Sequence, residues 1–304
     1  MLVKRKKVLS LVLMTFLFLM ISTSSFAFVC GDIDCSGGDP DITDITRLID
    51  YLYLSHDPLC DPLLADVNDS GGEPDMSDVS RLIDFLYGSH EPLNCPPPAT
   101  IMDIDGNIYH TIKIGDQWWL MENLRVTRYR NGDTIPNVSD SAAWVNLTTG
   151  AYCYYDNDTT YVETYGLLYN WYAIDDSCNI APEGWHVSSD EEWKQLEMYL
   201  GMSLEDADES GFWRGTDEGG KLKETSTTHW AYPNTGATNE SGFTALPGGV
   251  RGYSGSFADV GYQAIFWSPS ATFMYLRILD NNLSTIYQGW EYPASGFSIR
   301  CVRD

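Results

Sequence analysis

The chain has 304 residues, and its 43 acidic residues against 18 basic ones give a net charge of −25 at pH 7. With 43% hydrophobic residues, it is long enough for more than one globular domain. The strong negative charge argues against binding to nucleic acid or to an anionic membrane, because both are themselves negatively charged.

The first 27 residues have the pattern of a secretory signal peptide. Residues 4–7 are basic, residues 8–21 are apolar, and Ser25-Phe26-Ala27 is a small-x-small cleavage site. The alternative is an uncleaved anchor, but the apolar run is 14 residues long and a membrane span needs about 20. We therefore expect a secreted, extracellular protein, which could associate with the cell surface, with no membrane span in the mature chain.

Residues 28–95 contain an acidic sequence that is repeated with an offset of 34 residues. The copies begin at Asp32 and Asp66 and read DIDCSGGDPDITDITRLIDYLY and DVNDSGGEPDMSDVSRLIDFLY. Each copy has alternating oxygen-bearing side chains, two glycines and then apolar residues with the i, i+3, i+4, i+7 spacing of a helix face. These apolar residues are Ile45, Leu48, Ile49, Leu52, Val79, Leu82, Ile83 and Leu86. We expect the two copies to bury these faces against each other.

Alternating carboxylate, amide and hydroxyl oxygens are the donors that calcium prefers, and on these residues the repeat resembles a dockerin. That resemblance implies Ca²⁺ as cofactor and a cohesin-like scaffold protein as partner. The implied ligands are Asp32, Asp34, Ser36, Asp41 and Asp44 in loop one, and Asp66, Asn68, Ser70, Asp75 and Asp78 in loop two. The loops differ from a usual dockerin in closing at position thirteen and in having serine at position five. The alternative is a disulfide-linked helical hairpin with merely acidic turns.

The chain has seven cysteines, and export would allow disulfides to form. Four of them lie in the repeat and allow three connectivities, while three lie beyond it, so one of the seven has no partner within the chain. No pair has the CxxC spacing of a zinc site. The cysteines of the repeat are Cys30, Cys35, Cys60 and Cys95, and the others are Cys153, Cys178 and Cys301.

Three prolines at 96–98 begin a stiff linker over residues 96–100, after which residues 101–304 are rich in Trp, Tyr, Gly and Asn. Asp105-Gly106 predicts a hairpin, and residues 113–120 predict a strand, a turn and a strand. We expect two helices, over 141–146 and from a Ser188 or Ser189 cap to residue 200. Further strands are expected at 264–268, 274–279, 285–288 and 296–302. The fold class is therefore α+β with irregular β structure.

Several ordered blocks in residues 101–304 resemble the Fibrobacter succinogenes major paralogous domain. They include IGDQWW at 114–119, GLLYNW at 166–171, APEGWHV at 181–187, GFTALPGG at 242–249 and GFSIRCV at 296–302. The resemblance implies a C-type-lectin-like fold and biology related to polysaccharides, but no known activity. It also implies a disulfide between Cys178 and Cys301.

No catalytic constellation is recognisable in this domain. HExxH and GxSxG are absent, as are the Glu-Pro-Asn and Gln-Pro-Asp triplets of calcium-dependent lectins. The acidic residues 190–192 are explained by the start of a helix. Aromatic side chains in polar, loop-like segments are better candidates for ligand binding, and with a neighbouring arginine they are Trp213, Trp230, Arg251, Tyr253 and Trp290.

We therefore predict a secreted, non-catalytic binding protein. Its dockerin-like module would dock to a protein partner or scaffold, and its lectin-like domain would present a surface for a glycan or a cell-surface protein. One alternative is a polysaccharide-acting enzyme that is anchored in the same way. The other is a structural cell-surface protein in which the repeat is an intramolecular clasp.

Overall fold

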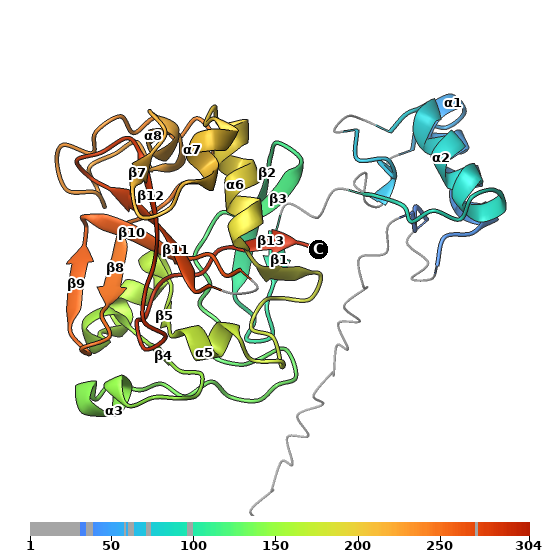
Figure 1. Cartoon of the computed structure of the whole chain (residues 1–304). Coiled ribbons are helices and arrows are strands. Elements are labelled where there is room, and N and C mark those ends of the chain that lie inside the picture. Colours follow the sequence, from blue (N-terminus) through green and yellow to red (C-terminus); the bar gives the residue numbers. More distant parts are fainter. Residues whose placement is uncertain are drawn as a thin grey trace, which may run out of the picture. The chain divides into compact units, whose positions relative to one another are not determined.

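The structure is a computed structural model that describes residues 31–34, 39–57, 59, 64–70, 74–95, 100–270 and 273–304. The chain divides into two compact units, Met1–Pro96 and Pro97–Asp304 (Figure 1). The predicted signal peptide lies outside the described residues, as does most of the proline-rich linker. None of the helices in the described part of the chain is long and apolar enough to cross a membrane.

Unit one contains two helices, α1 (Ile42–Tyr53) and α2 (Met76–Tyr87). Each begins with a capping box, in which an aspartate side chain accepts the backbone N–H three residues further on, and the aspartate at that position accepts the N–H of the first. Ile45 and Leu48 of α1 share one buried cluster with Val79 and Leu82 of α2. The predicted packing of the two copies is thus confirmed, except that Ile83 is 43% exposed.

The two helices of unit one also end in the same way. His56 and His90 have a positive φ, and their Nδ1 atoms lie 2.7 Å from the carbonyl oxygens of Tyr51 and Phe85. Arg47 and Arg81 each donate to a carbonyl ten residues further along, at Asp57 and Glu91. The repeated Ser-His sequence therefore closes a helix in both copies.

Unit two mixes helices and strands, which confirms the predicted α+β class. Its largest sheet has the order β1-β2-β3-β13-β6, and every pair in it is antiparallel. The strands are β1 (Thr100–Met102), β2 (Ile108–Ile114), β3 (Gln117–Leu120), β6 (Trp185–Val187) and β13 (Cys301–Arg303). The predicted hairpin at Asp105-Gly106 and the strand–turn–strand over 113–120 are both present.

A second antiparallel sheet has the order β10-β11-β12-β7. Its strands are β7 (Trp213–Arg214), β10 (Gln263–Trp267), β11 (Tyr275–Asp280) and β12 (Ile286–Trp290). Two smaller hairpins join β4 (Tyr152–Cys153) to β5 (Leu168–Tyr169), and β8 (Gly248–Arg251) to β9 (Phe257–Val260). The strand predicted over 296–302 is confirmed only at its end, where β13 begins at Cys301, because residues 296–298 form isolated bridges to three different segments.

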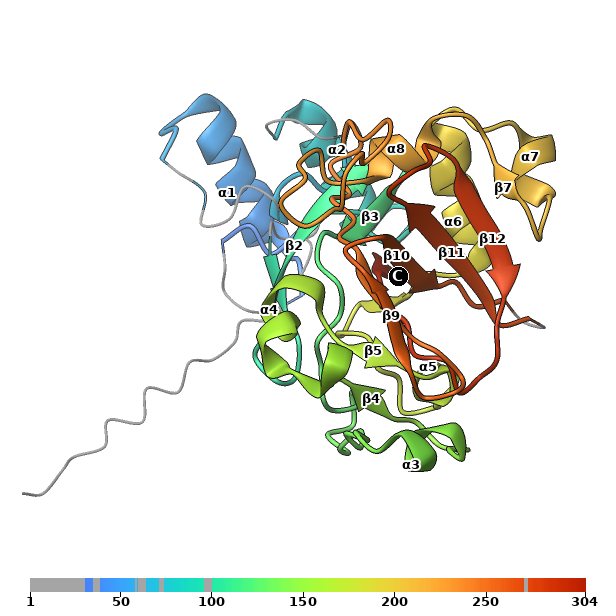
Figure 2. The ribbon, with the colours of Figure 1, turned by 90° about the vertical axis from the view of Figure 1, so that its left-hand side faces the viewer.

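The helices of unit two are more numerous than the sequence predicted. The two expected ones are α3 (Ser141–Val145) and α6 (Asp190–Tyr199), and α6 has Ser189 as its N-cap. The others are α4 (Val162–Tyr165), α5 (Trp171–Ile174), α7 (Leu204–Asp208) and α8 (Glu218–Leu222). These are too short to show helical periodicity. In two views, α3 lies at one end of the unit and α7 and α8 lie at the other (Figure 1, Figure 2).

The cysteines of unit two correct a prediction. Cys178 and Cys301 do not form a disulfide, and Cys153 is free as well. Cys301 is buried in the core on β13, whereas Cys178 lies in a surface turn where its Sγ is 3.1 Å from Nδ2 of Asn131. In unit one, Cys95 is disulfide-bonded. Cys30, Cys35 and Cys60 lie outside the described residues.

Candidate calcium loop and aromatic surface

Three aspartates converge in loop one. Carboxylate oxygens of Asp32, Asp34 and Asp44 all lie within 4.8 Å of one another. Asp32 and Asp44 are buried, with 4% and 2% of their surfaces exposed. The thirteenth residue of the loop therefore reaches the first and third, despite the one-residue expansion.

Backbone N–H groups hold the carboxylate of Asp44 in this position. Its Oδ1 accepts from Ile33 at 2.7 Å and from Asp34 at 3.0 Å, and its Oδ2 accepts from Asp41 at 2.8 Å. Burial nevertheless raises the pKa of Asp44, because desolvation disfavours the charged carboxylate and the nearby Asp34 adds repulsion. A cation at the cluster would oppose both effects.

Loop two repeats the arrangement with an amide in place of the carboxylate at the third position. Oδ1 of Asp66 accepts from the backbone N–H of Ser70 at 2.9 Å, and Oδ2 of Asp78 accepts from the N–H of Asp75 at 2.9 Å. Asp66 and Asp78 are both buried, and burial also raises the pKa of Asp78. Asn68 stands where loop one has Asp34, but Asp69 stands where loop one has Cys35, so the two loops contain equal numbers of carboxylates.

Two of the predicted ligands have another role in the described structure. Asp41 and Asp75 are the N-caps of α1 and α2, and each accepts the N–H of the residue two positions on at 2.6 Å. Ser36 lies outside the described residues. The set that converges in loop one is therefore Asp32, Asp34 and Asp44.

The spacing of these oxygens can be compared with the size of a metal ion. Calcium binds oxygens at 2.3–2.6 Å, so two of its ligands lie at most about 5 Å apart. Oxygens of Asp32, Asp34 and Asp44 that lie within 4.8 Å of one another are close enough to share a calcium ion, and carboxylates are hard donors of the kind that calcium takes. The residues present therefore fit the implied ion.

A groove lies beside loop one on the surface of unit one. Its volume is about 510 Å³, and it is lined by Asp34, Thr43, Thr46, Arg47, Ile49, Asp50 and Leu54. Leu54 is 72% exposed. Asp34 belongs both to the acidic cluster and to the wall of this groove.

In unit two, two of the predicted ligand-binding residues are buried, which corrects the prediction for them. Trp230 is 1% exposed and its Nε1 donates to the carbonyl of Ala245. Arg251 is fully buried, and its guanidinium donates to the carbonyls of Val138 and Ser139 at 2.6 and 2.9 Å. Neither side chain can reach a ligand at the surface.

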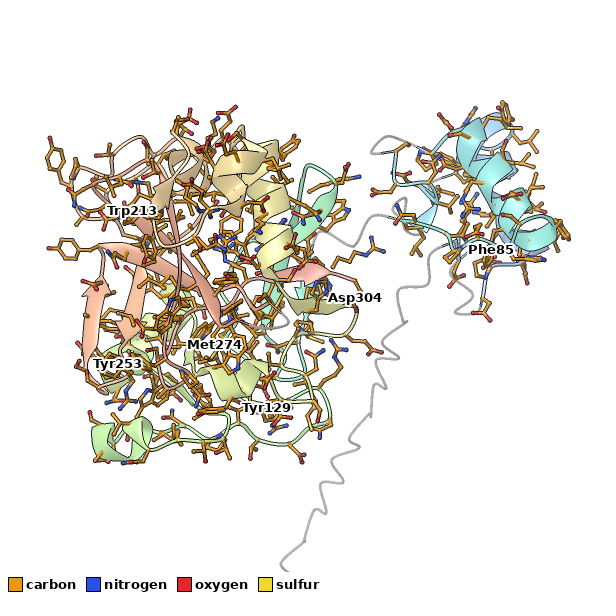
Figure 3. The ribbon with its side chains drawn as sticks, in the orientation of Figure 1. Phe85, Tyr129, Trp213, Tyr253, Met274 and Asp304 are labelled. Atoms are coloured by element: carbon orange, nitrogen blue, oxygen red, sulfur yellow. The ribbon has the colours of Figure 1, made fainter. Side chains whose placement is uncertain are left out.

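The other three predicted residues are exposed, and they lie on different elements of unit two. Trp213 is on β7, where its ring contacts that of Tyr287, while Tyr253 is on the turn between β8 and β9 (Figure 3). The rings of Tyr253 and Tyr292 lie 4.7 Å apart, and those of Tyr292 and Trp290 lie 6.2 Å apart. We call Tyr253, Tyr292 and Trp290 the aromatic row. Tyr292 was missed in the sequence, although it is two residues from Trp290.

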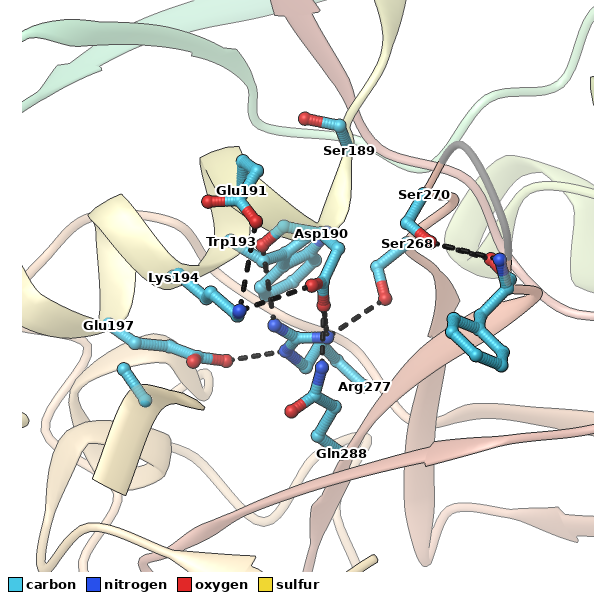
Figure 4. Close-up of polar contacts among 12 residues, drawn as sticks. Ser189, Asp190, Glu191, Trp193, Lys194, Glu197, Ser268, Ser270, Arg277 and Gln288 are labelled. Carbon is cyan, nitrogen blue, oxygen red and sulfur yellow. Dashed lines mark hydrogen bonds and ion pairs between the residues drawn. The ribbon is translucent and has the colours of Figure 1, made fainter. Parts of the chain in front are cut away.

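An open pocket of about 660 Å³ lies at the start of α6. Its lining is Ser189, Asp190, Glu191, Lys194, Pro269, Ser270, Phe273 and Tyr275. Below it, Arg277 donates to Asp190 at 2.8 Å and to Glu197 at 2.6 Å, and Gln288 donates to Asp190 at 2.6 Å (Figure 4). These polar contacts fix the floor of the pocket.

Comparison with known protein families gives one finding for this chain. The family described as the Fibrobacter succinogenes major domain matches residues 112–303, which is more than half of the chain. No curated protein matches the chain, and no solved structure matches it.

Proposed function

The chain belongs to the Fibrobacter succinogenes major domain family, and from that premise we propose that it is a secreted, non-catalytic binding protein. Unit one binds calcium and docks to a protein partner, and unit two, as a lectin-like domain, presents a ligand-binding surface. A cohesin-like scaffold protein is the partner class that the repeat favours.

One observation carries the docking part of this proposal. Asp34 belongs to the converging carboxylates of loop one and also lines the neighbouring groove. An ion held by Asp32, Asp34 and Asp44 would neutralise the charge at that end of the groove. It would also fix the wall against which a partner packs, so docking would depend on calcium.

The composition of the groove supports a protein as its occupant. Ile49 and Leu54 supply apolar surface, while Arg47 and Asp50 supply charges of both signs at its edge. Exposed apolar side chains with a polar rim are typical of protein interfaces. Ile42, which is 54% exposed, begins the same helix.

The test is capture of partners from the native secreted and cell-surface fraction, with the secreted chain as bait. We expect a protein that is retained in calcium, released by chelator and lost with Leu54→Glu. The matched control is Leu204→Glu, because Leu204 is 63% exposed on unit two and should not affect retention. Retention that is unchanged by chelator and by Leu54→Glu would refute the docking proposal.

A further inference from the structure

We propose that unit two binds a single soluble chain of neutral sugar residues along the aromatic row and into the pocket at the start of α6. This inference rests on the ligand-binding role proposed for unit two, and it names the class of ligand and the surface. Sugar binding by unit two is expected to be independent of calcium.

The row and the pocket are adjacent on one face of a sheet. Tyr275, which lines the pocket, is paired directly opposite Trp290 in the β11–β12 register. Residues opposite each other in an antiparallel pair point to the same face. Arg277 and Gln288, which are paired two residues further along and so lie on the same face, contact Asp190 of α6. The side chains of Tyr275 and Trp290 therefore project from the sheet on the α6 side.

Five aromatic rings thus lie between the turn from β8 to β9 and the pocket, and the step from Trp290 to Tyr275 is given by their pairing on adjacent strands. They belong to Tyr253, Tyr292, Trp290, Tyr275 and Phe273, and the last two have centroids 5.3 Å apart. Tyr253, Tyr292, Trp290 and Phe273 are each more than half exposed. Such a set of exposed rings, next to hydroxyl and carboxylate groups, offers both apolar faces and hydrogen bonds, as a sugar ring requires.

Buried contacts fix the end of the row that carries Tyr253. The guanidinium of Arg251 lies 4.4 Å from the ring of Trp144, whose Nε1 donates to the carbonyl of Ala294. Arg251 and Gly296 also exchange backbone hydrogen bonds of 3.1 and 2.7 Å. The turn that carries Tyr253 and the loop that carries Tyr292 are therefore held together before any ligand binds, which lowers the entropic cost of binding.

The angles between the rings favour a single chain over a flat, crystalline surface. Tyr253 and Tyr292 are inclined at 53°, and Trp290 and Tyr292 at 71°. A planar array of sugars needs rings in one plane, whereas a twisted single chain can meet inclined rings one after another.

Charge favours a neutral ligand. The pocket has the carboxylates of Asp190 and Glu191 beside the ammonium of Lys194, which is 3.6 and 3.7 Å from them. Glu291 lies in the chain between Trp290, the last residue of β12, and Tyr292 of the following loop. A polyanion would meet the exposed carboxylate of Glu191 and the overall negative charge of the chain, whereas the hydroxyl groups of a neutral sugar can hydrogen-bond to that carboxylate.

The test is calorimetric titration of the secreted chain with soluble hexasaccharides of β-linked glucose, xylose and mannose, with polygalacturonate as the anionic probe. We expect at least one neutral hexasaccharide to bind, equally in calcium and in chelator, and polygalacturonate not to bind. Trp290→Ala should weaken binding about tenfold or more, because truncating a central aromatic anchor removes a large share of the contact energy. Trp290→Phe should retain most of it.

The matched control is Tyr262→Ala, because Tyr262 and Tyr253 are both 55% exposed and only Tyr253 belongs to the row. Tyr253→Ala and Tyr292→Ala should weaken binding, and Tyr262→Ala should not. The proposal is overturned if no neutral hexasaccharide binds, or if binding is unaffected by all three row variants. Loss of a captured protein with Trp290→Ala, without sugar binding, would instead make the row a protein-docking surface. None of these results bears on the separate proposal that unit one captures a protein partner in the presence of calcium.

Discussion

Both units bury pairs of carboxylates, but they compensate the charge differently. In unit two, Glu197 is fully buried and receives hydrogen bonds from Arg214 at 2.9 Å and from Arg277 at 2.6 Å, and Arg277 also pairs with Asp190. In unit one, the described contacts of Asp44 are with backbone N–H groups. In unit two, the arginine side chains therefore compensate the charge of the buried carboxylates.

This difference suggests why calcium is expected in one unit and not in the other. Residues 28–95 contain only two basic residues, Arg47 and Arg81, and both donate to carbonyls at the ends of the helices. Partial charges of N–H groups offset the desolvation of a carboxylate only in part, as the raised pKa of Asp44 indicates. Under the proposed function, a calcium ion from solution would complete this buried cluster.

The largest expected effect is in the cluster of unit two. Glu197→Gln leaves the charges of Arg214 and Arg277 without a full partner, and we expect a loss of about 3–5 kcal/mol in the free energy of unfolding, measured with chemical denaturant. The control is Glu191→Gln, because that side chain is 77% exposed, and it should change stability by less than about 0.5 kcal/mol. A loss below about 1 kcal/mol for Glu197→Gln would show that the arginines do not depend on this carboxylate.

Calcium should have the next largest effect, and only on unit one. At a free concentration one hundred times Kd, an ion that binds the folded state alone stabilises it by about 2.7 kcal/mol. Thermal unfolding in calcium and in chelator should show this gain in the transition of unit one, while that of unit two stays unchanged.

The calcium gain can be separated from the role of Asp44 in the capping box. Asp44→Asn should remove the difference between calcium and chelator, whatever it does to stability in chelator, and Asp57→Asn, outside the loop, should preserve the difference. A gain of equal size in both variants would exclude Asp44 as a ligand.

The smallest expected effect is the loss of stability when the imidazolium of His186 is deprotonated at high pH. Nε2 of His186 is 2.6 Å from Glu192 and its Nδ1 is 2.8 Å from Asp304, and these hydrogen bonds raise the pKa of His186 from 6.5 to about 9. Since the folded-state pKa is the higher one, the stabilisation is complete below pH 6.5 and is lost as the pH rises to about 9.

The side chain of His186 is 36% exposed, so we expect less than about 1 kcal/mol from it. Denaturant unfolding between pH 6 and pH 10 should show this loss in the wild type and not in His186→Gln. Asp304→Asn should retain part of it through Glu192. An identical pH profile for wild type and His186→Gln would contradict the assignment.

Local signals predicted much of this structure. The capping of α6 by Ser189, the hairpin at Asp105-Gly106 and the packing of Leu48 with Leu82 follow from residues close together in the chain. The meeting of Asp32, Asp34 and Asp44 is likewise set within a single loop and the helix that follows it.

Distant partners decided what the sequence could not predict. Arg251 lies in a polar, glycine-containing stretch that is typical of exposed loops, but it is buried by carbonyls 112 and 113 residues away. Trp230 is buried in a hydrophobic cluster that includes Leu279 and Ile286, and Cys178 and Cys301 lie in separate environments. The aromatic row could be assembled only once the β8–β9 turn and the end of β12 were seen together.

The reactivity of the free thiols can be used to measure local opening of unit two. Cys153 and Cys301 are both buried, in different hydrophobic clusters, and burial raises the pKa of Cys153 to about 11. Because only a thiolate that reaches solvent is reactive, the rate of alkylation at each cysteine measures how often its part of the core opens. Equal rates would mean that the unit opens as one cooperative body, and unequal rates would identify the part that opens first.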